Sequence, residues 1–126
     1  MDLMDHSARA LAALIRNKEA SPSDAVHAAL ARIAERPELN AFITVTAEQA
    51  LDAARRAEAM VMAGETLGPL HGVPYSVKDL TFTAGVRTTM GSAIYEDFVP
   101  KDDAIAVARA KAAGAILIGK TTTPQF

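Results

Sequence analysis

The sequence has no cysteine and no tryptophan, and its 126 residues include only two tyrosines and four phenylalanines. Without cysteine the chain can form neither a disulfide framework nor a thiolate metal site. The scarcity of aromatic rings leaves no stacking platform for bases, and the 13 basic and 15 acidic residues form no basic cluster. These absences exclude a disulfide-stabilised scaffold and argue against a nucleic acid as a partner.

Long apolar runs are also lacking. The longest, such as 112–119, are far shorter than the roughly 20 residues that a membrane-spanning helix needs. Residues 1–6 have neither the positive region nor the apolar core of a signal peptide. His6 and His27 fall on the expected surfaces of helices, and no set of His, Asp and Glu has the spacing of metal ligands. We therefore expect a cytoplasmic protein with no membrane contact and no metal site.

What is present is a globular composition, with 50% hydrophobic and 22% charged residues. Apolar residues recur at helical intervals from about residue 5 to residue 20. Ser21 then has the features of a helix N-cap, followed by Pro22 at the first helical position and by Asp24 near the positive end of the helix dipole. We interpret residues 1–38 as a helical hairpin that covers a neighbouring core.

Residues 39–126 alternate between strand and helix patterns. Strands are predicted at 40–45, 73–78 and 115–118, and the last is a continuous apolar run that is typical of a strand buried on both faces. Strands that alternate with helices are joined by right-handed crossovers. The order therefore predicts an α/β fold in which N-terminal helices are followed by β-α-β-α-β, with a mixed, largely parallel sheet. The chain is a single domain or the N-terminal part of a larger one.

Two helices are expected between these strands. Thr46 begins a capping-box pattern, and Gly64 is placed to end that helix in the left-handed conformation. Asp102 or Asp103 is expected to cap the second helix, and Gly114 to close it.

Lys78 ends the predicted strand 73–78, whose residues alternate between apolar and polar or small side chains. A lysine beside a packed core is rarely buried without a partner, because removing its charge from water costs several kcal/mol. Its long stem can instead carry the ammonium back to solvent. The pattern alone leaves both interpretations open.

Five short blocks stand out in the second half of the chain: Gly68–Pro74, Val77–Asp79, Thr88–Ser92, Ala112–Thr121 and Pro124–Phe126. In this order they resemble the amidase signature family, the serine hydrolases that use a Ser–Ser–Lys triad. Several blocks in the right order are more specific than any one of them. The resemblance is close over the last half of the chain and loose over the first.

The resemblance implies that Lys78 is the catalytic base. In that family a neutral lysine takes a proton from a bridging serine, which takes one from the serine that attacks the amide carbonyl. Because the usual pKa of lysine is about 10.4, a base poised near about pH 7.5 needs a bias of roughly 4 kcal/mol against the ammonium. Desolvation can supply this bias and a surface strand cannot, so Lys78 fits the role only if it is buried.

The resemblance also implies hydrolysis of carboxamides to carboxylate plus ammonia or amine, without a metal or an organic cofactor. The family's two catalytic serines belong to a Gly/Ser-rich stretch that is not among these 126 residues. We therefore expect the chain to supply the base for a small-molecule amide substrate and to be inactive alone. The alternative is a non-catalytic α/β binding or assembly module that retains the amidase scaffold.

Ser76 and Ser92 are weaker candidates for a nucleophile. Ser76 lies two residues before Lys78 on the same face of the strand, but neither serine stands in a Gly-x-Ser-x-Gly elbow. His71, Asp79 and Ser92 could supply a Ser–His–Asp triad, which is recognised by geometry rather than by spacing. We prefer structural roles, with His71 as a turn histidine that donates to the backbone.

The polar segments 88–92 and 121–125 adjoin predicted strands, where α/β proteins usually place ligand contacts, so they are candidates for lining a pocket. Lys120 is expected to extend its ammonium into solvent at a strand end rather than to act as a second base. We also expect the strand 115–118, with no helix after it, to present an uncovered sheet edge through which the chain self-associates.

Overall fold

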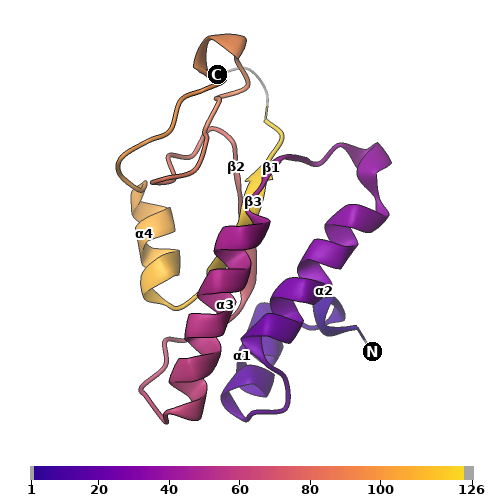
Figure 1. Ribbon diagram of the computed structural model, residues 1–126, viewed down its shortest axis with the longest axis vertical. Coiled ribbons are helices and arrows are strands. Elements are labelled where there is room, and N and C mark those ends of the chain that lie inside the picture. The colour runs from indigo at the N-terminus through magenta and orange to yellow at the C-terminus, as the bar shows by residue number, and fades with distance from the viewer. Residues whose placement is uncertain (1, 124–126) are drawn as a thin grey trace.

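The computed structural model describes residues 2–123 and contains four α-helices, three strands and three short 3₁₀ helices (Figure 1). The α-helices are α1 (Ala8–Arg16), α2 (Pro22–Glu35), α3 (Ala47–Met62) and α4 (Ile105–Ala112). The strands are β1 (Phe42–Val45), β2 (Pro74–Lys78) and β3 (Ile116–Thr121), and the 3₁₀ helices are η1 (Leu3–Asp5), η2 (Pro37–Leu39) and η3 (Ala93–Tyr95). This order confirms the predicted helical start followed by β-α-β-α-β. None of the described helices combines the length and the apolar character needed to cross a bilayer.

The three strands form one mixed sheet in the order β1-β3-β2. β3 runs antiparallel to β1 and parallel to β2, so one of the two strand pairs has the arrangement that a β-α-β crossover produces. The pairing of β2 with β3 shifts register between Tyr75 and Ser76, an irregularity of the kind that re-aims the side chains beyond it. The sheet is therefore mixed, as predicted, with β3 at its centre.

The central position of β3 corrects the expectation that this strand presents an uncovered edge. Both of its hydrogen-bonding edges are occupied, one by β1 and the other by β2. The apolar run predicts that the strand is buried, but strand order depends on pairing between distant segments, which the run does not encode. Self-association through a sheet edge stays a prediction, and in the described sheet it now concerns the outer edges of β1 and β2.

Helices α2 and α3 lie side by side and pack on β3, where they build the larger hydrophobic core (Figure 1). The buried residues of this core are mainly small and come from both helices and the strand: Val26, Ala29, Ala50, Ala54, Ala57, Ile116 and Ile118. A second cluster joins α1 to the molecule through Leu11 and the fully buried Ile15. Burying a side chain of that size contributes about 1.5–3 kcal/mol, which is why the short helix α1 holds its place.

The start of α2 confirms the predicted cap, and the start of α3 does not. Ser21 Oγ accepts from the N–H of Asp24 at 2.9 Å, and the Asp24 carboxylate accepts from the N–H of Ser21, which completes a capping box. Thr46 also precedes its helix, but its hydroxyl donates to the carbonyl of Leu117 in β3 at 3.2 Å. The local pattern at Thr46 is the same as at a capped helix, and the competing acceptor comes from a strand far along the chain.

The expectation that Asp102 or Asp103 caps α4 is also wrong. The residue at the N-cap is Ala104, and no side chain makes a capping hydrogen bond there. Asp103 instead accepts from the N–H of Ala84 at 2.7 Å and from the Lys111 ammonium at 2.9 Å. Its carboxylate therefore ties the connection after β2 to helix α4.

Gly64 and Gly114 close their helices in the left-handed conformation, as predicted, with φ of 72° and 93°. Their surroundings differ. A Cβ on Gly64 would meet nothing within 4 Å, whereas one on Gly114 would lie 2.7 Å from the Cα of His71. The C-terminal end of α4 is thus packed closely against the turn that leads into β2.

We expect Gly114→Ala to lower the free energy of unfolding more than the matched control Gly64→Ala. Both variants force a side chain into the left-handed region, at a cost of about 1 kcal/mol. Gly114→Ala must in addition displace the backbone at His71. Urea denaturation of the two variants measures the difference, and equal losses would contradict the close packing of α4 on this turn.

Candidate functional site

Lys78 is the last residue of β2, and its side chain is exposed in the described part of the chain. Two hydrogen bonds hold the peptide group between Lys78 and Asp79. The N–H of Asp79 donates to the Thr121 carbonyl of β3 at 2.9 Å, and the Lys78 carbonyl accepts from the N–H of Thr81 at 3.0 Å. The burial that a base requires is therefore not provided by residues 2–123, and the role of Lys78 stays a prediction.

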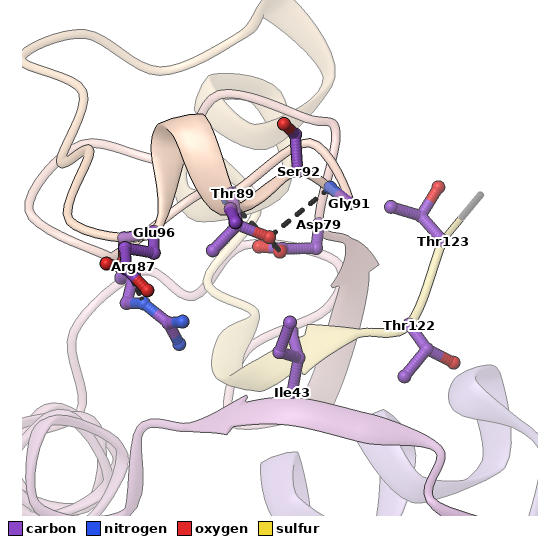
Figure 2. A pocket seen from close by; sticks show the side chains of 10 residues that line it. Ile43, Asp79, Arg87, Thr89, Gly91, Ser92, Glu96, Thr122 and Thr123 are labelled. Carbon is purple, nitrogen blue, oxygen red and sulfur yellow. Dashed lines mark hydrogen bonds between the residues drawn. The ribbon is translucent and has the colours of Figure 1, made fainter. Parts of the chain in front are cut away.

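A cavity of about 370 Å³ lies beside Asp79, the residue that follows Lys78 (Figure 2). It is lined by Ile43, Asp79, Arg87, Thr89, Gly91, Ser92, Ala93, Glu96, Thr122 and Thr123. Both polar segments that were predicted to line a pocket, 88–92 and 121–125, contribute to this wall, although Pro124 and Gln125 lie outside the described residues. Lys78 is not part of the lining.

Asp79 is fully buried, and its hydrogen bonds connect the end of β2 to residues 89 and 90 of the loop that follows. Its Oδ2 accepts from the N–H of Thr89 at 3.1 Å and from the Thr89 hydroxyl, as Figure 2 shows, and its carbonyl accepts from the N–H of Met90 at 2.9 Å. Its other carboxylate oxygen, Oδ1, is buried without a partner among the described residues. Asp79 lines the cavity, and its Oδ1 is an acceptor that the described residues leave unused.

Residues Thr89–Ser92 form a tight turn that is closed by the N–H of Ser92, which donates to the Thr89 carbonyl at 3.0 Å. Met90 and Gly91, its central residues, have φ of 55° and 70°. A side chain in the left-handed region costs roughly 1–2 kcal/mol, and such strain persists only where surrounding bonds determine the conformation. At Met90 those bonds are the ones that Asp79 accepts.

Lys120 contradicts the expectation that its ammonium is solvated at a strand end. The residue is 0% exposed, and β3 continues through it to Thr121. Its Nζ donates to the Thr81 carbonyl at 2.7 Å, to Thr83 Oγ1 at 3.0 Å and to Thr88 Oγ1 at 2.8 Å. Burial lowers the pKa of Lys120 below its usual 10.5, and the negative charge of Asp79 acts in the opposite direction.

Sequence reasoning treated Asp79, Thr88 and Lys120 separately and missed that they belong to one buried polar cluster. The signal was present. Lys120 directly follows the apolar run of a central strand, and the loop after β2 is rich in threonine, whose hydroxyls are acceptors for a buried ammonium. What the pattern does not show is that the loop folds back onto β3.

The structure sets His71 apart from the other two members of the hypothetical Ser–His–Asp triad, since Asp79 and Ser92 line the cavity and His71 does not. His71 is buried, and its Nε2 donates to the carbonyl of Ala57 in α3 at 2.9 Å, which confirms that it is a turn histidine bonded to the backbone. Ser92 Oγ accepts from the N–H of Ile94 and begins η3. Within residues 2–123 no hydrogen bond joins any two members of this triad.

Two other arrangements are absent from the described residues. Ser76 is exposed, and in the described structure no hydrogen bond connects it to Lys78. Across residues 2–123 no group of three or more His, Asp or Glu side chains is arranged to hold a metal ion.

Comparison with known proteins decides the family, because the family model described as Amidase matches residues 24–126. The chain belongs to the amidase signature family. It is 44% identical over 127 residues to one subunit of the glutamyl-tRNA(Gln) amidotransferase of Geobacter metallireducens, a match that covers 100% of this chain and 26% of that protein. This amidase chain therefore spans about a quarter of the length of the curated relatives it matches.

Solved structures of amidases share the fold of this chain. A bacterial aryl acylamidase of the amidase signature family superposes with a TM-score of 0.88 and 27% identity, over 94% of this chain and 25% of the other. The peptide amidase of Stenotrophomonas maltophilia gives a TM-score of 0.85 and 33% identity, over 93% of this chain and 24% of the other. The family to which the chain belongs is thus one of amide-hydrolysing enzymes.

The buried Lys120 should make the stability of the chain depend on pH. In the unfolded chain its pKa returns to 10.5, and in the folded chain burial holds it lower. Between these two values the unfolded chain binds more protons, so the free energy of unfolding should rise with pH across that interval. Below it both states are protonated, and the contribution is constant.

The variant Lys120→Met keeps most of the stem and cannot titrate. The difference in unfolding free energy between the wild type and this variant should therefore rise with pH in the interval just below 10.5, as measured by urea denaturation. Taking the difference cancels the contribution of Tyr75, because both proteins contain this residue. Burial raises the pKa of Tyr75, so its titration makes the free energy of unfolding fall as pH rises. A difference that stays flat or falls with pH would contradict a desolvated ammonium at this position.

Proposed function

We propose that these residues form the N-terminal portion of an amide hydrolase that uses a Ser–Ser–Lys mechanism, with Lys78 as the general base. The observation that carries the proposal is the family match across residues 24–126, which includes Lys78 at the carboxyl end of β2. The reaction would be attack of a serine hydroxyl on a carboxamide carbonyl, with departure of ammonia or an amine. Both serines would come from a segment outside these residues.

The mechanism requires that Lys78 be covered when it acts. A neutral lysine near about pH 7.5 needs a bias of roughly 4 kcal/mol, which only desolvation or nearby charge supplies. Lys78 is exposed in a chain that has about a quarter of its relatives' length. We propose that the rest of an amidase domain covers this amine, while the peptide group that follows Lys78 is already held by hydrogen bonds to Thr121 and Thr81.

The substrate is proposed as a carboxamide, without a narrower choice. The similar proteins named above are a component of an amidotransferase, an aryl acylamidase and a peptide amidase, and the amide bond is what these names have in common. Because the first is named as one subunit of its enzyme, it favours a role within a larger assembly. A cytoplasmic location and self-association through the edge of β1 or β2 are part of the same proposal.

A non-catalytic module is the second candidate, favoured by the exposure of Lys78 and by the positions of Ser76 and Ser92 away from any nucleophile geometry. The reading frame that follows the codon for Phe126 distinguishes the two functions. A Gly/Ser-rich segment within a few dozen codons supports the hydrolase. A stop codon directly after Phe126 supports the module.

The 126 residues alone should release no ammonia from simple carboxamides, with or without the substitution Lys78→Ala. In the complete polypeptide that carries them, Lys78→Ala should lower kcat about a hundredfold or more, because general acid–base catalysis contributes that much. Lys101→Ala is the matched control, since Lys101 is an exposed lysine in the connection before α4.

Two results would contradict this account. Turnover by the short chain that disappears on Lys78→Ala would show that a nucleophile is already present. An unchanged kcat for Lys78→Ala in the complete polypeptide would remove Lys78 from the reaction.

A further inference from the structure

The long connection between β2 and α4 contains only one short 3₁₀ helix, η3, yet it is held at its base by two buried residues of opposite charge. It lies at the top of Figure 1, at the end of the molecule away from α1. The two charged residues are Asp79, at the start of the connection, and Lys120, in the central strand β3. The proposed mechanism uses neither of them.

Lys120 organises the first part of this connection. An ammonium has three protons, and the three acceptors around Nζ come from Thr81, Thr83 and Thr88. Because the lysine projects from the central strand, the loop can satisfy this charge only by lying across the end of β3. The bonds therefore fix the path of the loop as well as the charge.

Asp79 organises the next part. Its carboxylate and carbonyl accept from Thr89 and Met90, and they hold the tight turn that lines the cavity. Thr88 and Thr89 are consecutive, and the first is bonded to Lys120 while the second is bonded to Asp79. The two charged residues thus bind neighbouring residues of the same loop. Lys120, Asp79 and the loop residues bonded to them form a single cluster.

The connection between Lys120 and Lys78 runs through the backbone. In the ladder between β2 and β3, Val77 pairs with Lys120 and Lys78 pairs with Thr121. Neighbouring residues of a strand point to opposite faces, so the side chains of Lys78 and Lys120 lie on opposite faces of the sheet. The route between them is the short segment 78–81, whose two ends are bonded to β3 and to the Lys120 ammonium.

We propose that Lys120 is a positioning residue, which together with Asp79 holds residues 79–90 in one conformation and thereby fixes the backbone from which Lys78 projects. The effect on the loop stands by itself, and only the effect on turnover rests on the proposed function.

The effect on the loop can be measured on the 126-residue chain by amide hydrogen exchange. Thr88→Val removes one acceptor of the ammonium and leaves the shape of the side chain nearly unchanged. The N–H groups of Thr89 and Met90 should then exchange about tenfold faster or more, relative to the amides of α3. The matched control is Thr46→Val, which removes the hydroxyl of another buried threonine beside β3, outside the cluster.

The effect on turnover is measured in the complete polypeptide. Thr88→Val and Lys120→Met should lower kcat about fivefold or more and leave KM within about twofold, since misplacement of a catalytic group affects the transition state more than substrate binding. Thr46→Val should change neither constant. Thr88→Val keeps two of the three acceptors, so it informs on the cluster even where Lys120→Met fails to fold.

The outcomes separate this inference from the proposed function. Exchange that is unchanged in Thr88→Val, or accelerated equally at every amide, would overturn the positioning role. So would an unchanged kcat in Thr88→Val when Lys78→Ala abolishes turnover. If Lys78→Ala leaves turnover intact, the proposed function fails, and the exchange experiment alone decides whether the cluster holds the loop.

Discussion

The buried ammonium of Lys120 is the interaction on which the arrangement of the loop and the cavity depends. Removing an isolated charge from water costs several kcal/mol, and a lysine in the centre of a sheet persists only if its hydrogen bonds offset that cost. Three bonds to oxygen atoms, each worth about 1.5–3 kcal/mol when the donor is charged, are of the required size. The loop and the lysine therefore stabilise each other, since neither could keep its place without the other.

Lys78 and Lys120 lie on neighbouring strands and have opposite environments. Lys78 is exposed, and Lys120 is enclosed and surrounded by acceptors. Although burial lowers the pKa of Lys120, a site that provides an acceptor for each of three protons suits an ammonium and gives the nitrogen no free direction from which to take a proton. The buried lysine is thus suited to holding structure. The role of general base is proposed for the exposed lysine alone.

Sequence patterns correctly predict the features that depend on residues close together in the chain, such as helix ends and buried strands. Ser21 and Pro22 mark the start of α2, Gly64 the end of α3, and the apolar run 115–118 the buried strand β3, and all of these appear in the structure. The order of the five short blocks was specific enough to indicate the family that the comparison then showed.

Long-range partners account for what could not be predicted. Thr46 and Asp103 each have the chemistry of a cap, but the acceptor or donor that each one meets comes from a distant segment. Lys120 stands where a lysine at the solvated end of a strand would stand, and the threonines that enclose it lie more than thirty positions earlier in the chain.

The protonated, hydrogen-bonded state of Lys120 can be observed directly by NMR of the chain labelled with ¹⁵N in its five lysine side chains. The account predicts one ammonium signal whose protons exchange slowly with water and which disappears in Lys120→Met. Five rapidly exchanging ammonium groups would contradict it.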